Sequence, residues 1–312
     1  MVNNIKIMKS SLPQKSSRPA GIQLSAPQGW RDYALLDSGG GQKLEKYGPY
    51  TLIRPEPEAF WNPALPKTEW DRAAAVFESG SETHGGHWKT RSKLPERWKV
   101  EYQDLRFWVQ PSASRHVGIF PEQASHWDWL EEKIKQANRP VKVLNLFGYT
   151  GAASLAAAHA GAQVTHLDAA PRVIQWGREN QSLSGLDAKP IRWIKDDALK
   201  FVKREARRDS RYDGIMLDPP KFGRGPQGEV WEFYDLISSL LQACKDILTD
   251  QPLFLILTAY AVKASSITLY NAISELMQPW SGTTESGELV LEEQSAGRLL
   301  STAIFTRWSS TK

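Results

Sequence analysis

Five consecutive residues combine a carboxylate, two prolines and an aromatic ring: Asp218, Pro219, Pro220, Lys221 and Phe222. Two successive prolines cannot continue a strand ladder or a helix interior, so the chain must leave the preceding apolar run in an extended conformation. The backbone carbonyls and Asp218 are then available to an amino or heteroaromatic nucleophile, and Phe222 can stack on its ring. The alternative is a purely structural exit from a strand.

A second feature is a turn with two glycines, followed by two carboxylates. Gly148 and Gly151 come after an apolar run and let the backbone approach a ligand closely. The turn is neither a dinucleotide fingerprint nor a phosphate loop. Asp168 ends the next apolar run, where it can accept two ribose hydroxyls, and Asp197 follows the third, where it can accept an adenine amino group. Each Asp can instead simply cap a helix, but together these residues predict an adenosine-sized ligand across three loops.

These residues follow runs of strand length that alternate with segments of helical length. The predicted strands are 141–147, 163–168, 191–195, 214–217 and 253–258. The predicted helices are 121–138, 152–159, 171–183, 199–207, 230–248 and 265–277. Two last runs, 288–291 and 299–307, predict a hairpin around Gly297. The alternation predicts an α/β fold with a doubly wound, mainly parallel sheet and one antiparallel edge strand, whose ligands bind outside the carboxyl ends of the strands.

The part of the chain before this sheet has a different sequence pattern. Residues 29–120 hold short alternating runs separated by turn-forming stretches, which predicts a small, mainly antiparallel α+β domain with one helix near 67–79. We expect residues 1–28 to form a basic, flexible tail. Residues 121–312 then make up the domain with the doubly wound sheet.

Together these motifs resemble those of class I S-adenosylmethionine-dependent methyltransferases. The chain is most similar to bacterial large-subunit (23S) ribosomal RNA methyltransferases, a family that includes cytosine-C5 and guanine-N7 enzymes. The segment 116–123 is similar to that family's G-x-F-x-x-Q element beside the cofactor. The resemblance covers 115–312 and, less closely, the small antiparallel domain. It implies a Rossmann-like methyltransferase sheet, S-adenosylmethionine as cofactor, S-adenosylhomocysteine as product and an RNA substrate.

The resemblance also implies roles for individual residues. Asp168 would hold the ribose of the cofactor and Asp197 its adenine. The other cofactor-binding residues that it implies are Gln123, Phe147, Gly148, Tyr149, Thr150, Gly151, Ala169 and Asp218. The catalytic residues that it implies are Asp218, Pro219, Pro220 and Phe222, with Lys221 and Phe222 in contact with the substrate. Because the sulfonium is already activated, the protein mainly has to align the reacting atoms and exclude water.

Two departures from the family pattern narrow the chemistry. Cytosine-C5 methylation needs a thiolate, which those relatives carry after the fifth strand, whereas this chain has no cysteine at 257–263. The single Cys244 falls in the predicted helix 230–248 and is expected in the core. We therefore expect an acceptor with its own lone pair, on a ring or exocyclic nitrogen or an oxygen. Second, only residues 1–28 precede the small domain, so we expect the family's additional N-terminal RNA-binding module to be absent.

The charge distribution bears on the RNA substrate. The net charge is +4, and Lys6, Lys9, Lys15 and Arg18 in the tail, without any acid before residue 21, account for all of it. The denser basic segment is 85–99, which interleaves cations with tryptophans. Its candidate RNA-contacting residues are Trp88, Lys89, Arg91, Lys93 and Trp98; the alternative is a solvated basic hairpin. Most of the thirteen tryptophans precede residue 130, and we expect them to fill the core of the small domain.

Several classes of protein are excluded or disfavoured. A single cysteine excludes a disulfide framework, and His84, His87 and His116 lack the paired spacing of a metal site, so we expect no metal. The sequence has no apolar stretch of membrane-spanning length and no signal peptide, which predicts a cytoplasmic protein without a membrane partner; it indicates no particular oligomeric state.

The main hypothesis is a methyltransferase acting on an RNA base nitrogen. The alternatives are a small-molecule or protein acceptor, a nicotinamide-dependent oxidoreductase and a non-catalytic binding protein.

Overall fold

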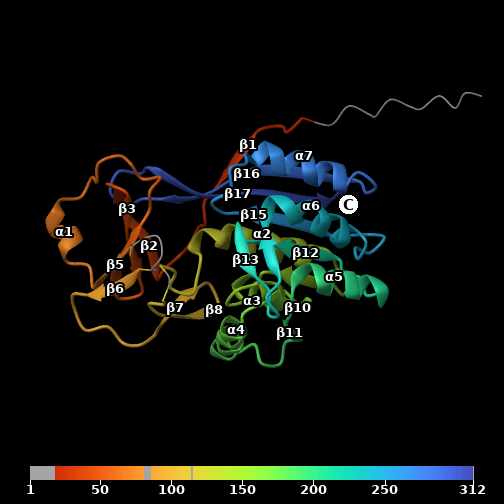
Figure 1. Cartoon of the computed structure of the whole chain (residues 1–312), viewed down its shortest axis with the longest axis horizontal. Helices are drawn as coiled ribbons and strands as arrows, with labels where there is room; N and C mark the ends of the chain where they lie inside the picture. Colours follow the sequence, from red (N-terminus) through yellow and green to blue (C-terminus); the bar gives the residue numbers. More distant parts are fainter. Residues whose placement is uncertain (1–17, 81–85, 114, 312) are drawn as a thin grey trace, which may run out of the picture.

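Within residues 18–80, 86–113 and 115–311, which the computed structural model describes, the chain forms an eight-stranded sheet flanked by helices and a smaller part built on a five-stranded sheet and a separate hairpin. The two parts lie next to each other (Figure 1). Lys6, Lys9, Lys15 and His84 lie outside the described residues.

The large sheet has the strand order β1-β16-β17-β15-β12-β9-β10-β11. Its strands are β1 (Ile22–Ser25), β9 (Lys142–Leu146), β10 (Gln163–Asp168), β11 (Ile191–Lys195), β12 (Gly214–Leu217), β15 (Phe254–Ala259), β16 (Gly282–Glu292) and β17 (Leu299–Ser310). The five strands from β15 to β11 run parallel. The chain moves outward from β9 to β11 and then returns to β12 on the other side of β9, which confirms the predicted doubly wound order.

Two details of this sheet differ from the prediction. The antiparallel strand β17 lies between β15 and β16 rather than at the edge. β1 adds outside β16 and runs parallel to it, so residues 22–25 are a strand rather than part of a flexible tail. Gly287 makes this pairing possible, because a Cβ at that position would lie 1.9 Å from the carbonyl oxygen of Gln23.

The central strands are apolar on both faces because helices cover both. The helices are η1 (Pro121–Gln123), α2 (Ala124–Gln136), α3 (Ala152–His159), α4 (Pro171–Leu183), α5 (Ala198–Arg207), α6 (Phe233–Lys245) and α7 (Ser266–Leu276). In β9, Val143 shares a core with α2 and α3, whereas Leu144 and Leu146 share a second core with α5, α6 and α7. This alternation follows from the two-residue period of a strand.

Two predicted helices are shorter than expected. The predicted helix 67–79 consists of α1 (Lys67–Asp71) followed by the strand β5 (Ala75–Glu78), because the apolar run there pairs with the small sheet. The predicted helix 230–248 begins with a strand, β14 (Val230–Glu232), which pairs with β13 (Phe222–Arg224) before α6 starts. In both places pairing with a neighbouring strand prevails over the helical pattern.

The small part is mainly antiparallel, as predicted. Its sheet has the order β2-β3-β4-β5-β6, and only β4 and β5 pair in parallel. The strands are β2 (Tyr33–Gly39), β3 (Gln42–Tyr47), β4 (Tyr50–Pro55), β5 and β6 (His87–Thr90), with a separate hairpin of β7 (Trp98–Tyr102) and β8 (Leu105–Val109).

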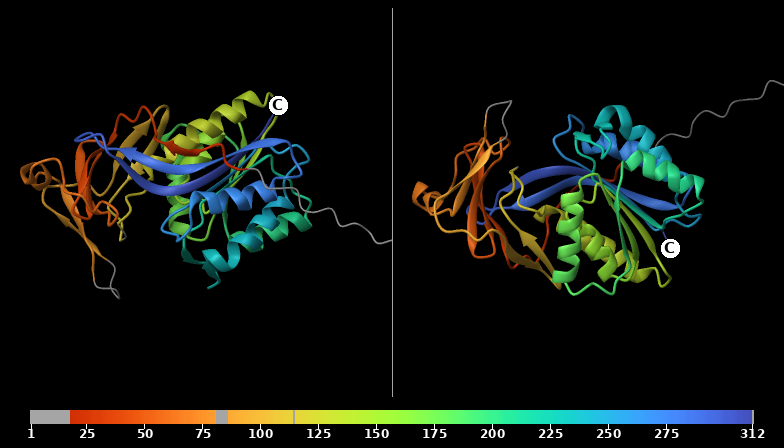
Figure 2. Two further views of the ribbon diagram at one scale, coloured as in Figure 1. Left: turned by 90° about the horizontal axis from the view of Figure 1, so that it is seen from above. Right: turned by 60° about the horizontal axis from the view of Figure 1, so that its bottom comes forward.

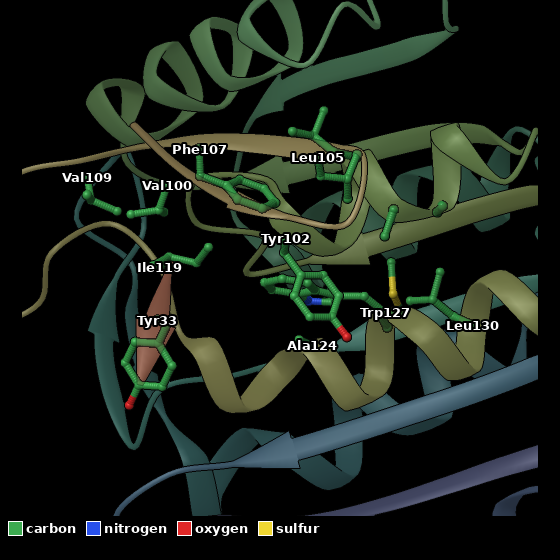
Figure 3. Close-up of a cluster of buried hydrophobic side chains, with 14 of the residues drawn as sticks. Tyr33, Val100, Tyr102, Leu105, Phe107, Val109, Ile119, Ala124, Trp127 and Leu130 are labelled. Atoms are coloured by element: carbon green, nitrogen blue, oxygen red, sulfur yellow. The ribbon is translucent and has the colours of Figure 1, made fainter. Parts of the chain in front are cut away.

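One hydrophobic core continues from this small part into the large one. Figure 3 shows Tyr102 and Phe107 of the β7–β8 hairpin lying over Trp127 of α2. The tryptophans that are buried in or packed against the hydrophobic cores include Trp30, Trp61, Trp70, Trp88, Trp98, Trp127 and Trp129. The expectation that the early tryptophans fill a core is confirmed, but this core spans residue 120 instead of ending there.

A buried polar cluster also joins the two parts, at the turn between β16 and β17. This turn reaches the small sheet (Figure 2), where Gln294 N donates to Leu35 O at 2.9 Å. Arg298 binds Glu293 at 2.5 Å and Asp37 at 3.4 Å, and both carboxylates are fully buried. Asp37 accepts further hydrogen bonds from Ser295 Oγ, Trp70 Nε1 and the amides of Ala64 and Leu65. We call Asp37, Glu293, Ser295 and Arg298 the tip cluster.

Asp37→Ala should lower the free energy of unfolding by about 3–5 kcal/mol. The reason is that several buried hydrogen-bond donors, and the ion-pair partner Arg298, would lose their acceptor. A urea titration measures this as a lower midpoint. The matched control is Arg72→Ala, whose exposed pair with Glu69 should contribute no more than about 0.5 kcal/mol. Equal midpoints for the two variants would contradict the role of the tip cluster.

Candidate active site

The loops that follow β9, β10, β11, β12 and β15 surround a cavity of about 460 Å³. Its walls include one polar or aromatic side chain from each loop: Tyr149, Asp168, Asp197, Asp218 and Tyr260. The cavity therefore lies at the carboxyl edge of the sheet, where we expected it, and its volume suits a cofactor or a small ligand. A smaller cavity of about 60 Å³ shares Phe147, Tyr149 and Asp218 with it and extends under the glycine turn toward Gln123 and His126.

The glycine turn after β9 is tightly constrained. Phe147, Tyr149 and Gly151 all have positive φ angles, of 57°, 50° and 86°, and Gly151 tolerates this without a Cβ. A Cβ on Gly148 would lie 2.4 Å from the ring of His166, so only glycine fits beneath the turn. Phe147 and Tyr149 line the large cavity, Gly148 and Thr150 line the small one, and Gly151 lines neither.

Asp168, at the end of β10, is held by the backbone of its neighbours. Its Oδ2 accepts from Tyr149 N at 3.0 Å and its Oδ1 from Ala170 N at 2.9 Å. Each carboxylate oxygen keeps a second lone pair for a ligand, and Asp168 and Ala169 both line the cavity. Burial raises the pKa of Asp168. A rigid carboxylate of this kind can accept both hydroxyls of a diol.

Asp197 serves as a helix cap and also lines the cavity. Its Oδ1 accepts from Lys200 N at 2.9 Å and caps α5. Its neighbour Asp196 also lines the cavity and pairs with Arg204 at 2.5 Å. The capping alternative for Asp197 is confirmed, and capping leaves its second oxygen available. We call Asp168, Asp196 and Asp197 the acidic end of the cavity.

A chain of partly buried hydrogen bonds holds Asp218. The side-chain amide of Gln123 donates to Asp218 Oδ2 at 3.0 Å and to the Tyr260 hydroxyl at 3.1 Å. Tyr260 in turn donates to Glu122 Oε1 at 3.1 Å. Burial and the nearby Glu122 raise the pKa of Asp218 to about 8. Gln123, expected to contact the cofactor, thus donates one hydrogen bond to Asp218 and the other to the Tyr260 hydroxyl.

Sequence reasoning did not identify Glu122 and Tyr260. Glu122 stands next to Gln123 inside the G-x-F-x-x-Q element, and an acid among apolar neighbours was the available signal. Tyr260 directly follows β15, the place where a catalytic thiol would be expected. The two residues are 138 positions apart in the chain, so no local pattern links them.

The Pro-Pro exit leaves β12 without helix or strand, but Phe222 is placed differently than expected. Pro219, Pro220 and Lys221 line the cavity, whereas Phe222 does not and is 57% exposed. Lys221 lies in the bend before β13, and Phe222 is the first residue of that strand. Trp231 Nε1 also occupies the carbonyl of Pro220, at 2.7 Å. The expectation that Phe222 stacks on the acceptor inside the cavity is therefore corrected.

The described residues 86–99 of the basic segment do not line this cavity. Trp98 is buried in the core, where its Nε1 donates to Tyr47 O at 2.9 Å, so it is not available for contact with RNA. Trp88 is half-buried and donates to Ser112 O. Lys89 lies 3.3 Å from Glu78, and Arg91 lies 3.9 Å from Asp71. Lys93 belongs to the same segment. Acids of the folded chain thus offset much of the positive charge that made this segment a candidate for contact with RNA.

The cysteine, the candidate metal ligands and the helices bear on the remaining expectations. Cys244 is fully buried in α6, as predicted, and burial raises the pKa of its thiol. In the part of the chain that the structure describes, no three His, Cys, Asp or Glu side chains are grouped so as to hold a metal ion. None of the described helices combines the length and apolar character needed to cross a membrane.

The comparisons with known proteins all lead to methyltransferases. The family described as S-adenosylmethionine-dependent methyltransferase matches residues 82–245. Ribosomal RNA large subunit methyltransferase K/L of Hahella chejuensis is 33% identical over 162 residues, which is 51% of this chain and 21% of that protein. The protein of the same name from Shewanella sp. (strain ANA-3) is 36% identical over 98 residues, 31% of this chain and 14% of that protein. The match therefore spans only a small part of the length of either relative.

Solved structures extend the similarity to the whole chain. The SAM-dependent methyltransferase from Agrobacterium tumefaciens is 44% identical with a TM-score of 0.87, covering 97% of this chain and 100% of that chain. A putative methyltransferase from Streptococcus mutans is 20% identical with a TM-score of 0.65, covering 89% of this chain and 75% of that chain, and shares the fold.

Asp168→Ala should weaken the binding of S-adenosylhomocysteine about 100-fold, since two hydrogen bonds to a carboxylate contribute about 1.5 kcal/mol each. Isothermal calorimetry measures the change, and NAD should give no heat with either protein. Asp168→Asn tests the same contact with less risk to the turn and should also bind more weakly. Asp209→Ala, whose side chain is 83% exposed, is the control and should bind normally. Unchanged affinity in both Asp168 variants would contradict this assignment.

Proposed function

The chain belongs to the S-adenosylmethionine-dependent methyltransferase family, and from this premise we propose that it methylates a nitrogen of an RNA base, in the cytoplasm, by direct transfer without a covalent cysteine intermediate. S-adenosylmethionine supplies an activated methyl group on its sulfonium. Membership of this family argues against the nicotinamide-dependent oxidoreductase. The remaining question is which acceptor the cavity takes and which residues serve it.

The acidic end of the cavity fits the adenosine half of the cofactor. Asp168 would accept the ribose hydroxyls and Asp197 the adenine amino group, through the oxygens that the backbone bonds leave available. Phe147 and Tyr149 in the glycine turn would border the methionine half, because they line both cavities. These positions direct the reactive end of the cofactor toward the loop after β12.

Asp218 is the observation that carries the proposal. Gln123 binds its Oδ2, and no described residue donates a hydrogen bond to its Oδ1, although Asp218 lines the cavity. A carboxylate with one fixed oxygen and one available oxygen can receive the N–H of an acceptor amine and orient its lone pair toward the methyl group. Pro219 and Pro220 would keep the backbone beside it extended.

The surroundings of Asp218 favour an acceptor that needs no thiol. The one cysteine of the chain is buried in α6, and Tyr260 occupies the cavity wall directly after β15. A base carbon such as cytosine C5 requires a thiolate to become nucleophilic, whereas a nitrogen brings its own lone pair. RNA as the carrier of that nitrogen is supported by the names of the curated relatives.

Deletion of the gene should remove one N-methylated nucleoside from large-subunit ribosomal RNA. Mass spectrometry of digested RNA from the deletion strain measures the loss, which the wild-type gene should restore and Asp218→Ala should not. An unchanged set of nucleosides would overturn the assignment to large-subunit ribosomal RNA and would leave another RNA, a small molecule or a protein as the acceptor.

The rate of transfer should rise with pH up to about 8 and then level off, because only ionised Asp218 accepts a proton and its pKa is raised to about 8. Asp218→Asn should lower the rate about 100-fold or more and remove this rise. Transfer of tritiated methyl groups to RNA from the deletion strain measures both.

Cys244→Ala is the matched control for this series. Because the thiol lies in the core and away from the cavity, the variant should keep a rate within about twofold of wild type, even where it unfolds at a lower urea concentration. Loss of transfer in a folded Cys244→Ala protein would instead indicate a covalent mechanism.

A further inference from the structure

We propose that Arg115, Lys221 and Arg224 form a phosphate-binding site at the mouth of the cavity, which holds the backbone of a single-stranded RNA while one of its bases enters beside Asp218. This proposal rests on the proposed function and specifies how the same site would recognise its substrate. We call the three cations the basic rim.

The three cations come from two distant segments and meet at one cavity. Lys221 and Arg224 belong to the chain that leaves the Pro-Pro turn, and Arg115 belongs to the segment before η1; all three line the same cavity. The carbonyl of Arg115 accepts from the buried Arg54 at 3.4 Å, which anchors this segment. All three side chains are exposed, so a ligand can approach them from solvent.

None of the three cations of the basic rim forms an ion pair with an acid of the described chain. Among the residues that the structure describes, no acid lies within ion-pair distance of the three, and Glu229 of the same hairpin is bound by Lys200 at 2.6 Å. The basic segment 85–99 differs, since Lys89, Arg91, Arg97 and Lys99 each lie within ion-pair distance of an acid. Three unpaired cations around one opening are the arrangement that a polyanion would stabilise.

Neighbouring titratable groups add no positive charge to the basic rim at neutral pH. Burial and the charge of Arg54 lower the pKa of His116, which also lines the cavity, to about 4. His116 is therefore neutral, and the positive charge belongs to the basic rim alone. The carboxylates of the acidic end belong to other loops around the same cavity, where the cofactor would be held.

This polarity sets the direction in which a substrate enters. The acidic end repels phosphates and suits the hydroxyls and amino group of adenosine, whereas the basic rim attracts phosphates. A nucleotide held by the basic rim can extend its base toward Asp218, which lines the same cavity as all three cations. A base inside a duplex cannot reach this position without leaving its stack, so a single strand fits best.

The β13–β14 hairpin offers a further contact for such a strand. Phe222 is 57% exposed and Val230 is 53% exposed, on the same hairpin as Lys221 and Arg224. An exposed aromatic ring beside cations is the usual platform for an unpaired base. Phe222, which does not face the cavity, would thus stack on the neighbouring base rather than on the methylated one.

The test measures binding of a fluorescent, short single-stranded RNA of mixed sequence across a series of salt concentrations, with S-adenosylhomocysteine present. Arg115→Gln, Lys221→Gln and Arg224→Gln should each reduce the slope of log affinity against log salt by about 0.7, which is about a fivefold loss at about 0.1 M salt. The triple variant should lose about three times that slope. Phe222→Ala should weaken binding without changing the slope.

Lys93→Gln is the matched control, because it removes one exposed cation from the basic segment 85–99 instead; it should bind RNA as wild type does. Binding of S-adenosylhomocysteine should be the same in every variant, which verifies folding. Wild-type slopes in the three rim variants, or no binding of RNA by the wild-type protein, would overturn the proposal.

The same measurements separate this proposal from the proposed function. If the deletion strain lacks a methylated nucleoside but the rim variants bind RNA normally, the methyltransferase assignment stands and the basic rim is wrong. If the rim variants lose RNA binding while ribosomal RNA is unchanged in the deletion strain, the phosphate site stands and the acceptor lies in another RNA.

Discussion

The reversal of strand order at β9 is the constraint on which the rest of the structure depends. Because β9, β10, β11, β12 and β15 are parallel, their carboxyl ends meet at one edge of the sheet. On either side of β9 the connections lead to helices on opposite faces, and this divergence leaves a crevice between the loops. The glycine turn, Asp168 and Asp218 are brought together by this topology although they are far apart in the chain.

The small part of the molecule completes that crevice. The shared core through Tyr102 and Trp127 and the buried tip cluster fix it against the large sheet. The segment that carries Arg115, Glu122 and Gln123 joins this part to the large sheet; Arg115 lines the cavity, and Gln123 binds Asp218. The cavity therefore has one wall made by the sheet and another made by the chain that enters it, and Asp218 is held between them by Gln123.

Most of the charged groups of the cavity are segregated by loop. Asp168, Asp196 and Asp197 lie at or after the ends of β10 and β11, whereas Lys221 and Arg224 follow Asp218 after β12 and Arg115 precedes η1. The cavity can therefore take the hydroxyl-rich half of a ligand at the acidic end and an anionic group at the basic rim. Orientation of both ligands then follows from electrostatics before any specific contact forms.

Local patterns in the sequence determined the doubly wound sheet, the glycine turn, the Pro-Pro exit and the burial of Cys244, because strand and helix periods and proline geometry act over a few residues. Tertiary structure alone decided that Trp98 lies in the core, that Phe222 does not line the cavity and that acids offset the charge of the segment 85–99. It also brought Glu122 to Tyr260 and placed Arg115 and Lys221 along one cavity. These outcomes depend on which surfaces meet when distant segments pack, and no spacing within one segment carries that information.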